Sequence, residues 1–160
     1  MKSKTSALMI SALAFCLLAA MMAAGASAQT KQPNLSGTWK MNAEKSKFEQ
    51  GGPSAITLKL EQKDGSLTET LILMTDNGER SMDAKYTTDG KETAQDVMGR
   101  TAQTSAKWEG DALLIDWKAE GGGFSRKLTV SPDGKTLTMI VKQSGPDGQG
   151  STDNVVLEKQ

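Results

Sequence analysis

The sequence predicts an all-β protein, an antiparallel up-and-down β-barrel of about 8–10 strands, with a two-sheet β-sandwich as the alternative. Apolar and polar residues alternate with the period of two that is typical of strands, as at Ile56, Leu58 and Leu60. Asp-Gly and Asn-Gly pairs separate these runs and supply the positive φ values of tight hairpins. No stretch has the spacing of a long amphipathic helix. Strands joined by short turns form a meander, and closing a meander into a barrel removes its exposed edges.

The first 28 residues have the three parts of a secretory signal peptide. Lys2 and Lys4 give a basic start, residues 7–24 form an apolar run, and the segment ends in the small-x-small sequence Ala-Ser-Ala. We therefore expect residues 1–28 to be removed and residues 29–160 to form a single domain, either periplasmic or secreted. An uncleaved membrane anchor is the alternative, because the apolar run approaches spanning length. The Ala-x-Ala ending favours removal.

The composition of the expected mature chain excludes several functions. It holds 17 basic and 19 acidic residues, a net charge of −2, which is too balanced to indicate a nucleic acid or an anionic membrane as partner. The chain has no His, and its one Cys, Cys16, lies in the signal segment. Zinc sites, Ser-His triads and thiol catalysis are therefore excluded, and so are disulfides. We expect no cofactor, no metal site and no enzymatic activity.

The remaining chain divides into short strands. Residues 42–52 read as a connection, Gly121 to Gly123 as a flexible loop, and residues 144–150 as a second loop. The region from Pro146 to Asp153 has two carboxylates, but their spacing is not that of a calcium loop. The strands are expected at residues 37–41, 56–61, 66–75, 80–87, 92–97, 100–108, 112–118, 124–130, 135–143 and 154–158.

The segment from Ser36 to Lys40, Ser-Gly-Thr-Trp-Lys, followed by a short link and a strand meander, resembles the calycin superfamily, and most of all the small bacterial lipocalin-like exported proteins. The Ser-Pro-Asp-Gly-Lys-Thr-Leu-Thr turn beginning at Ser131 is similar to turns in that group. The resemblance implies a lipocalin-like barrel in which Gly37 and Trp39 plug one end, with Trp39 near an arginine of a late strand. The link is too short for the helical lid of the fatty-acid-binding proteins, and the last strand lacks their Arg-x-Tyr, so fatty-acid transport is not implied.

Side-chain parity singles out the arginines, because successive side chains of a strand point to opposite faces. Arg80, Arg100 and Arg126, the only arginines, all fall on the same strand face as the apolar residues, which we call the apolar parity of the strand. The mid-strand lysines all share the polar parity: Lys59, Lys85, Lys107, Lys127 and Lys142.

This separation predicts that one or more arginines point into the barrel and hold an anionic head group by charge-assisted hydrogen bonds. Tyr86 and Thr104 could add donors. A buried arginine needs a partner, and Glu69, on the apolar parity of its strand, is the candidate. In the alternative, Arg80 and Arg100 reach solvent at the strand ends, and Arg126 stacks on Trp39.

Two functions remain open. The first is a monomeric binding protein that holds a small hydrophobic or anionic amphiphilic ligand, without stable membrane insertion after signal removal. The second is a filled barrel that contacts a protein or inhibits an enzyme through its loops. The cavity expected for the first function is lined by Ile56, Leu58, Leu71, Met82, Tyr86, Leu113, Ile115 and Met139, with Arg126 near the head group.

Overall fold

The computed structural model describes residues 32–97, 99–145 and 150–160. The chain divides into two units, Met1–Thr30 and Lys31–Gln160, and the described residues belong to the second. The expected signal peptide and its cleavage site therefore lie outside the described residues. Within the described part, no helix is long and apolar enough to cross a membrane.

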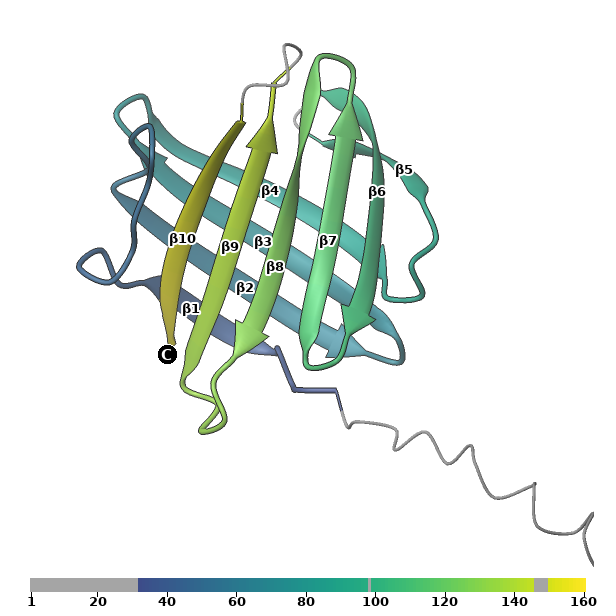
Figure 1. Ribbon diagram of the computed structural model, residues 1–160, viewed down its shortest axis with the longest axis horizontal. Coiled ribbons are helices and arrows are strands. Elements are labelled where there is room, and N and C mark those ends of the chain that lie inside the picture. Colours follow the sequence, from purple (N-terminus) through teal and green to yellow (C-terminus); the bar gives the residue numbers. More distant parts are fainter. Residues whose placement is uncertain (1–31, 98, 146–149) are drawn as a thin grey trace, which may run out of the picture. The chain divides into compact units, whose positions relative to one another are not determined.

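The described residues form ten strands (Figure 1). The strands are β1 (Gly37–Met41), β2 (Ala55–Lys63), β3 (Ser66–Thr75), β4 (Gly78–Thr87), β5 (Thr93–Val97), β6 (Arg100–Glu109), β7 (Ala112–Ala119), β8 (Gly122–Val130), β9 (Thr136–Ser144) and β10 (Gly150–Lys159).

All ten strands belong to one antiparallel sheet with the order β4-β3-β2-β1-β10-β9-β8-β7-β6-β5. Every neighbouring pair is consecutive in the chain except β1 and β10, which join the two ends of the meander. The sheet curls into a nearly closed barrel, and Figure 1 shows β7 to β10 crossing β2 to β4 at an oblique angle. The up-and-down barrel expected from the sequence is confirmed.

The β2–β3 turn illustrates why the turn dipeptides matter. Asp64 and Gly65 have φ values of 49° and 75°, and Lys63 pairs with Ser66 on either side of them. Positive φ at both central residues gives the turn a twist that matches the flanking strands. Aspartate and glycine tolerate this region better than other residues, so the dipeptide fixes the hairpin register.

The core lies inside the barrel and follows the predicted parity. Its fully buried members come from seven of the strands and, with Leu35, from the segment before β1: Leu35, Trp39, Leu58, Leu67, Leu113, Ile115, Leu128, Leu137 and Leu157. The five mid-strand lysines are all exposed, as their polar parity predicts. The eight residues expected to line a cavity all belong to this core or pack against it, with Met82 only half-buried.

Two glycines expected in a flexible loop are instead part of β8. Gly122 and Gly123 pair with Ala119 and Lys118 of β7. A Cβ on Gly122 would lie 2.5 Å from the carbonyl oxygen of Ser144, and one on Gly123 would collide with the carbonyl of Trp117. The glycines therefore let the neighbouring backbone approach closely while the ladder continues, a use of strand glycine that composition alone does not distinguish from a loop.

The last strand also begins earlier than expected, at Gly150 rather than at residue 154. Asp153 is buried, and its carboxylate accepts a hydrogen bond from the backbone N–H of Glu49 at 3.0 Å. The Glu49 carboxylate in turn accepts from the backbone N–H of Thr152 at 2.8 Å. These hydrogen bonds hold residues 150–153 in the strand. The polar composition that suggested a loop reflects contacts with Glu49, in the connection between β1 and β2.

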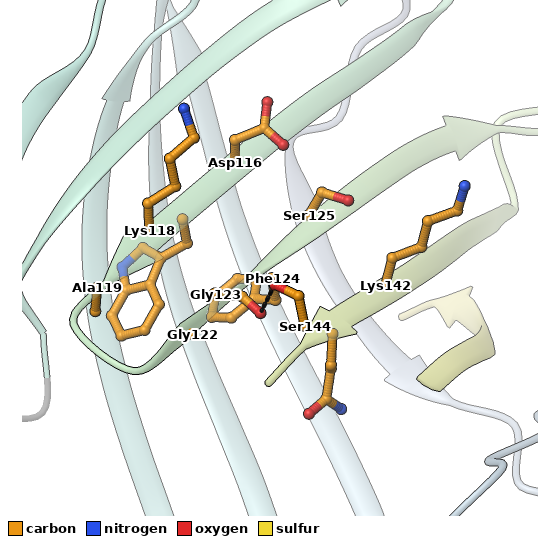
Figure 2. Close-up of a pocket in the computed structure, with 11 residues that line it drawn as sticks. Asp116, Lys118, Ala119, Gly122, Gly123, Phe124, Ser125, Lys142 and Ser144 are labelled. Atoms are coloured by element: carbon orange, nitrogen blue, oxygen red, sulfur yellow. Dashed lines mark hydrogen bonds between the residues drawn. The ribbon is translucent and has the colours of Figure 1, made fainter. Parts of the chain in front are cut away.

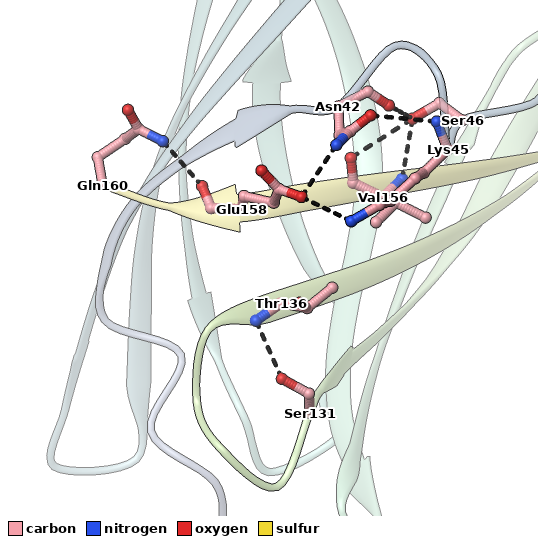
Figure 3. A network of polar contacts seen from close by, with 8 residues as sticks. All are labelled: Asn42, Lys45, Ser46, Ser131, Thr136, Val156, Glu158 and Gln160. Atoms are coloured by element: carbon pink, nitrogen blue, oxygen red, sulfur yellow. Dashed lines mark hydrogen bonds and ion pairs between the residues drawn. The ribbon is translucent and has the colours of Figure 1, made fainter.

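A second set of contacts holds the same connection against β10 (Figure 3). Glu158 accepts hydrogen bonds from the Asn42 amide and the Lys45 ammonium, both at 2.9 Å. The Ser46 hydroxyl donates to the carbonyl of Asn42 at 2.7 Å and accepts from the backbone N–H of Val156 at 3.0 Å. The connection therefore lies along the edge of β10 and needs no helix to be ordered.

Strands β4 and β5, the two ends of the sheet, meet through a side chain. No backbone ladder joins them among the described residues. Instead, the Gln95 amide of β5 accepts from the backbone N–H of Lys85 at 3.3 Å and donates to its carbonyl at 2.8 Å. The same amide nitrogen lies 2.6 Å from the hydroxyl of buried Thr104. Gln95 therefore imitates a peptide group between β4 and β5. Just past the end of β4, the backbone N–H of Gly90 also donates to the carbonyl of Ala106 in β6 at 2.8 Å.

We expect Gln95→Ala to open this contact. The Lys85 amide loses its acceptor, so its hydrogen exchange should become faster by about tenfold, with a loss of about 1 kcal/mol in the free energy of unfolding. Hydrogen exchange followed by NMR measures the first and urea denaturation the second. Gln103→Ala, an exposed change on β6, is the matched control. Unchanged exchange at Lys85 would show that the amide contact does not hold β4 and β5 together.

Candidate functional site

The most unusual feature of the interior is a buried ion pair. Arg126 of β8 is 3% exposed and Glu69 of β3 is fully buried. The guanidinium donates from Nη1 to Oε1 at 2.7 Å and from Nη2 to Oε2 at 2.9 Å. Such a bidentate pair uses both oxygens of the carboxylate. Glu69, the residue predicted as a candidate partner for a buried arginine, thus pairs with Arg126.

The strands that carry the pair place it across the interior. In the sheet, β3 and β8 are separated by β2, β1, β10 and β9, so they belong to different walls of the barrel. Glu69 lies between Leu60 and Ala84 in the register, and Arg126 lies between Ile115 and Val141. The ion pair therefore ties two walls together through the core.

Tyr86 of β4 extends this cluster. Its hydroxyl accepts a hydrogen bond from Arg126 Nη2 at 3.2 Å, and its side chain is 3% exposed. Burial, together with the negative charge of Glu69, raises the pKa of Tyr86 to about 12, although the Arg126 charge opposes the shift. The phenol is therefore protonated at neutral pH.

The arginine itself stays charged. Burial disfavours the guanidinium cation and lowers its pKa, but the carboxylate of Glu69 outweighs this effect, so the pKa of Arg126 lies above its ordinary value. The guanidinium carbon also lies 5.5 Å from the centroid of the Phe124 ring, which stacks on Trp117 with centroids 4.9 Å apart. The negative face of an aromatic ring adds a weak attraction for the cation.

Tyr86 is the only tyrosine, which makes its titration directly observable. We expect tyrosinate absorbance to appear with a midpoint near pH 12 in the folded protein and near pH 10 in denaturant. A raised pKa means that the folded state retains the proton longer than the unfolded state. The stability linked to this proton is complete below about pH 10 and falls by about 3 kcal/mol as pH rises to about 12.

Tyr86→Phe is the control, because it removes the titrating group and keeps the ring. The free energy of unfolding of the wild type, measured relative to this variant, should fall over the same pH interval. A folded-state midpoint near 10 would mean that the hydroxyl is neither buried nor close to Glu69.

Two buried donors have no acceptor among the described residues. They are Nε of Arg126 and Nε1 of Trp108. Ala106, Ile115 and Arg126 are opposite one another on β6, β7 and β8, so they lie at one level of the barrel interior. Trp108 lies on the next interior level, opposite Leu113. A buried N–H without a partner is uncommon in proteins and calls for an acceptor.

The side chains around the pair are small on one side. Ala84 flanks Glu69 in the register, and Ala106 pairs with Ile115 beside Arg126. Both alanines are buried, as is Ala102 on β6. Thr104, expected to offer a free donor, instead lies 3.2 Å from the carbonyl of Thr93 and is also held by Gln95.

Of the other two arginines, only the side chain of Arg80 is described, and it does not join this cluster. Arg80 is exposed on β4. Arg100 begins β6, and its side chain lies outside the described set. Of the three arginines and Tyr86, the structure thus brings together Arg126 and Tyr86. Their role toward a ligand stays a prediction.

The Gly-x-Trp segment forms a separate cluster. Trp39 is fully buried, and its Nε1 donates to the carbonyl of Leu35 at 2.9 Å. The cation over its ring is Lys159 of β10, whose ammonium lies 5.1 Å from the ring centroid, whereas Arg126 lies over Phe124. Gly37, at φ 138°, leaves room for this lysine, because a Cβ there would lie 2.7 Å from Lys159 Cε. A lysine thus occupies the place that the resemblance assigned to an arginine.

Hollows also occur on the outer face of the barrel. One of about 320 Å³ lies over β7, β8 and the end of β9 (Figure 2). Asp116, Ser125 and Lys142 project on one side of the strands there, and the Phe124 ring lies on the other. A neighbouring hollow of about 400 Å³ is lined by Leu114, Ile140 and Lys127, among others. Within the described residues, no group of acidic, histidine or cysteine side chains is arranged to hold a metal ion.

Sequence reasoning identified the ion pair but missed two features of the site. The unpartnered N–H of Trp108 was hidden by the apolar parity of that residue, which indicates only a core position. The contact of Arg126 with Phe124 had a signal, since the two residues are two positions apart on one strand and share a face. Nothing in the sequence marks Gln95 as the residue that joins β4 to β5.

The fold is that of a calycin-type β-barrel. No protein-family model and no curated protein sequence matches the chain. Solved structures do. Human cRBP IV matches with a TM-score of 0.54 and 19% identity, over 77% of this chain and 97% of that one. The zebrafish ileal bile acid-binding protein complexed with cholic acid matches with a TM-score of 0.57 and 18% identity, over 78% of this chain and 98% of that one.

A secretory abundant heat soluble protein from Ramazzottius varieornatus is similar in fold too. Its TM-score is 0.62 at 11% identity, and the match covers 82% of this chain and 98% of that one. At these identities the likeness concerns the fold. Most of each neighbouring chain is matched, so the ten-stranded barrel corresponds to the whole of those proteins rather than to a part of them.

Proposed function

We propose that this protein is an exported barrel that binds a small hydrophobic or amphiphilic molecule in its interior. The observation that carries the proposal is the buried Arg126, whose Nε donates to no acceptor among the described residues, whereas both of its Nη atoms donate to Glu69. A donor in this position offers a polar contact to a molecule that is otherwise surrounded by apolar side chains.

Three further findings support the proposal. The buried alanines Ala84, Ala102 and Ala106 occupy interior positions where larger side chains would fill more space. Proteins with this fold include one solved with cholic acid and one named as a fatty-acid-binding protein. The absence of histidine from the whole sequence fits a binding role better than catalysis. We further propose that the chain acts as a monomer in the periplasm or outside the cell.

Native mass spectrometry of the protein, purified from its own compartment without detergent, tests the proposal. A mass excess that disappears on denaturation would identify a bound molecule, and its mass would indicate the chemical class. A mature chain that begins at Gln29 would support export with signal removal. A bare polypeptide mass that is unchanged after incubation with apolar and amphiphilic probes would contradict ligand binding. It would favour a filled barrel that acts through its loops.

A further inference from the structure

The interior polar cluster carries no net charge available to a ligand. Glu69 contributes one negative charge and Arg126 one positive charge, and each oxygen of the carboxylate is paired with a different Nη of the guanidinium. The Tyr86 hydroxyl, which accepts a hydrogen bond from Arg126, is protonated at neutral pH and adds no charge. An incoming head group therefore meets an already neutralised pair rather than a free cation.

The ion pair disfavours a ligand head group of either charge, negative or positive. A carboxylate that reached Arg126 would lie close to the carboxylate of Glu69 in a low-dielectric interior, where like charges repel strongly. Displacing Glu69 from the arginine would leave a fully buried negative charge without its partner. An ammonium would meet the same problem with Arg126. The pair thus excludes the anionic head group that an unpaired arginine would select.

The hydrogen-bonding groups of the interior that remain free are donors. Arg126 Nε is a donor without an acceptor in the described structure, and so is Trp108 Nε1 at the neighbouring interior level. The Tyr86 oxygen accepts from Arg126, which leaves the phenol proton to donate. Both oxygens of Glu69 already accept from Arg126. A ligand that satisfies this cluster must supply an acceptor.

We propose that the interior site selects uncharged amphiphiles whose head group presents an acceptor oxygen, such as an ester, a ketone or an ether, and discriminates against carboxylates. This inference rests on the proposed function and narrows it. It replaces the anionic head group expected from the sequence, because the charge of Arg126 is neutralised by Glu69 within the protein. The ligand oxygen accepts from Arg126 Nε, and its apolar part packs against the core.

A length-matched series tests the selectivity. Decanoate, methyl decanoate and decylamine share one apolar chain and differ in head group, and displacement of an apolar fluorescent dye gives their relative affinities. We expect the ester to bind at least about tenfold more tightly than the acid or the amine. Comparable or tighter binding of decanoate would overturn the inference while leaving the proposed function in place. Displacement by none of the three would contradict both.

Glu69→Gln provides the sharper test, because it removes the negative charge and keeps the shape of the side chain. The charge of Arg126 is then uncompensated, so decanoate should gain at least about tenfold in affinity while the ester changes little. Glu61→Gln, the same change at an exposed position of β2, is the matched control and should leave the ranking unaltered. An unaltered ranking in Glu69→Gln as well would overturn the inference.

The selectivity of the site can be tested even if Glu69→Gln does not fold. Circular dichroism establishes whether Glu69→Gln retains the strand content of the wild type. If it does not, Trp108→Phe removes one unpartnered donor without touching the ion pair. It should reduce the preference for methyl decanoate over decane, because the ester then meets one donor fewer; an unchanged preference would place Trp108 outside the site. The wild-type ranking of ester against acid remains the deciding measurement in either case.

Discussion

Glu69→Leu and Arg126→Met, made singly, should each lower the free energy of unfolding by about 3–5 kcal/mol. Each change removes one partner of a pair that is almost fully buried and leaves the other charge without compensation. Urea denaturation at neutral pH measures the loss. The size of the effect follows from the cost of holding an unpaired charge away from water, and not from the strength of the ion pair itself.

The double variant Glu69→Leu/Arg126→Met distinguishes these two quantities. Because it removes both charges and replaces them with apolar side chains, we expect it to recover most of the loss and to lie within about 1–2 kcal/mol of the wild type. Additive losses in the double variant would contradict this account. The exposed pair Lys45–Glu158 is the control, since water screens its partners and single changes there should have much smaller effects.

This coupling affects how ligand binding should be examined. Replacing Arg126 alone by alanine disturbs the fold and the site together, because it also leaves Glu69 unpaired. A loss of binding in that variant would not identify Arg126 as a ligand contact. Glu69→Gln keeps an acceptor for the guanidinium and is the more informative change.

Trp39→Ala should destabilise the protein by about 3–5 kcal/mol. The side chain is fully buried, so its removal leaves a large cavity, and the carbonyl of Leu35 loses the hydrogen bond from Nε1. Lys159 also loses the ring over which its ammonium lies. Denaturation monitored by circular dichroism measures the effect, because the fluorescence signal changes when a tryptophan is removed.

Trp39→Phe separates the two contributions. It keeps an aromatic ring in the core but lacks the N–H, so it should cost clearly less than Trp39→Ala. A loss below about 1 kcal/mol for Trp39→Ala would show that Trp39 does not hold this end of the barrel together. That result would also remove the structural role assigned to the Gly-x-Trp segment.

The fold was predictable because two independent signals agree along most of the chain. Period-two alternation places Leu58 and Leu113 in the core and Lys59 on the surface, and Asp-Gly pairs such as Asp64-Gly65 mark the turns between strands. Both signals are local, so they survive without knowledge of the partner strands. The observed strand bounds differ from the expected ones where a residue pairs in the sheet although its type suggests a loop, as at Gly122 and Gly123.

The candidate site was partly predictable for the same reason. Parity placed Arg126 and Glu69 inside the barrel, and the cost of a buried charge required that they pair. Parity cannot give the register across the interior. The bidentate geometry, which neutralises Arg126, and the unpartnered N–H of Trp108 depend on how the two walls of the barrel face each other. The sequence therefore indicated a charged anchor where the structure has a neutral pair with free donors.

The pairing of β1 with β10 has a consequence for how the chain reaches its final form. Trp39 is opposite Lys159 of β10, so β1 has no partner on one side until β10 is present. Pairings this distant in sequence form late, because the loop they close is nearly the whole domain. During folding, β1 therefore keeps one open edge until β10 pairs with it, and the barrel is completed only at that step.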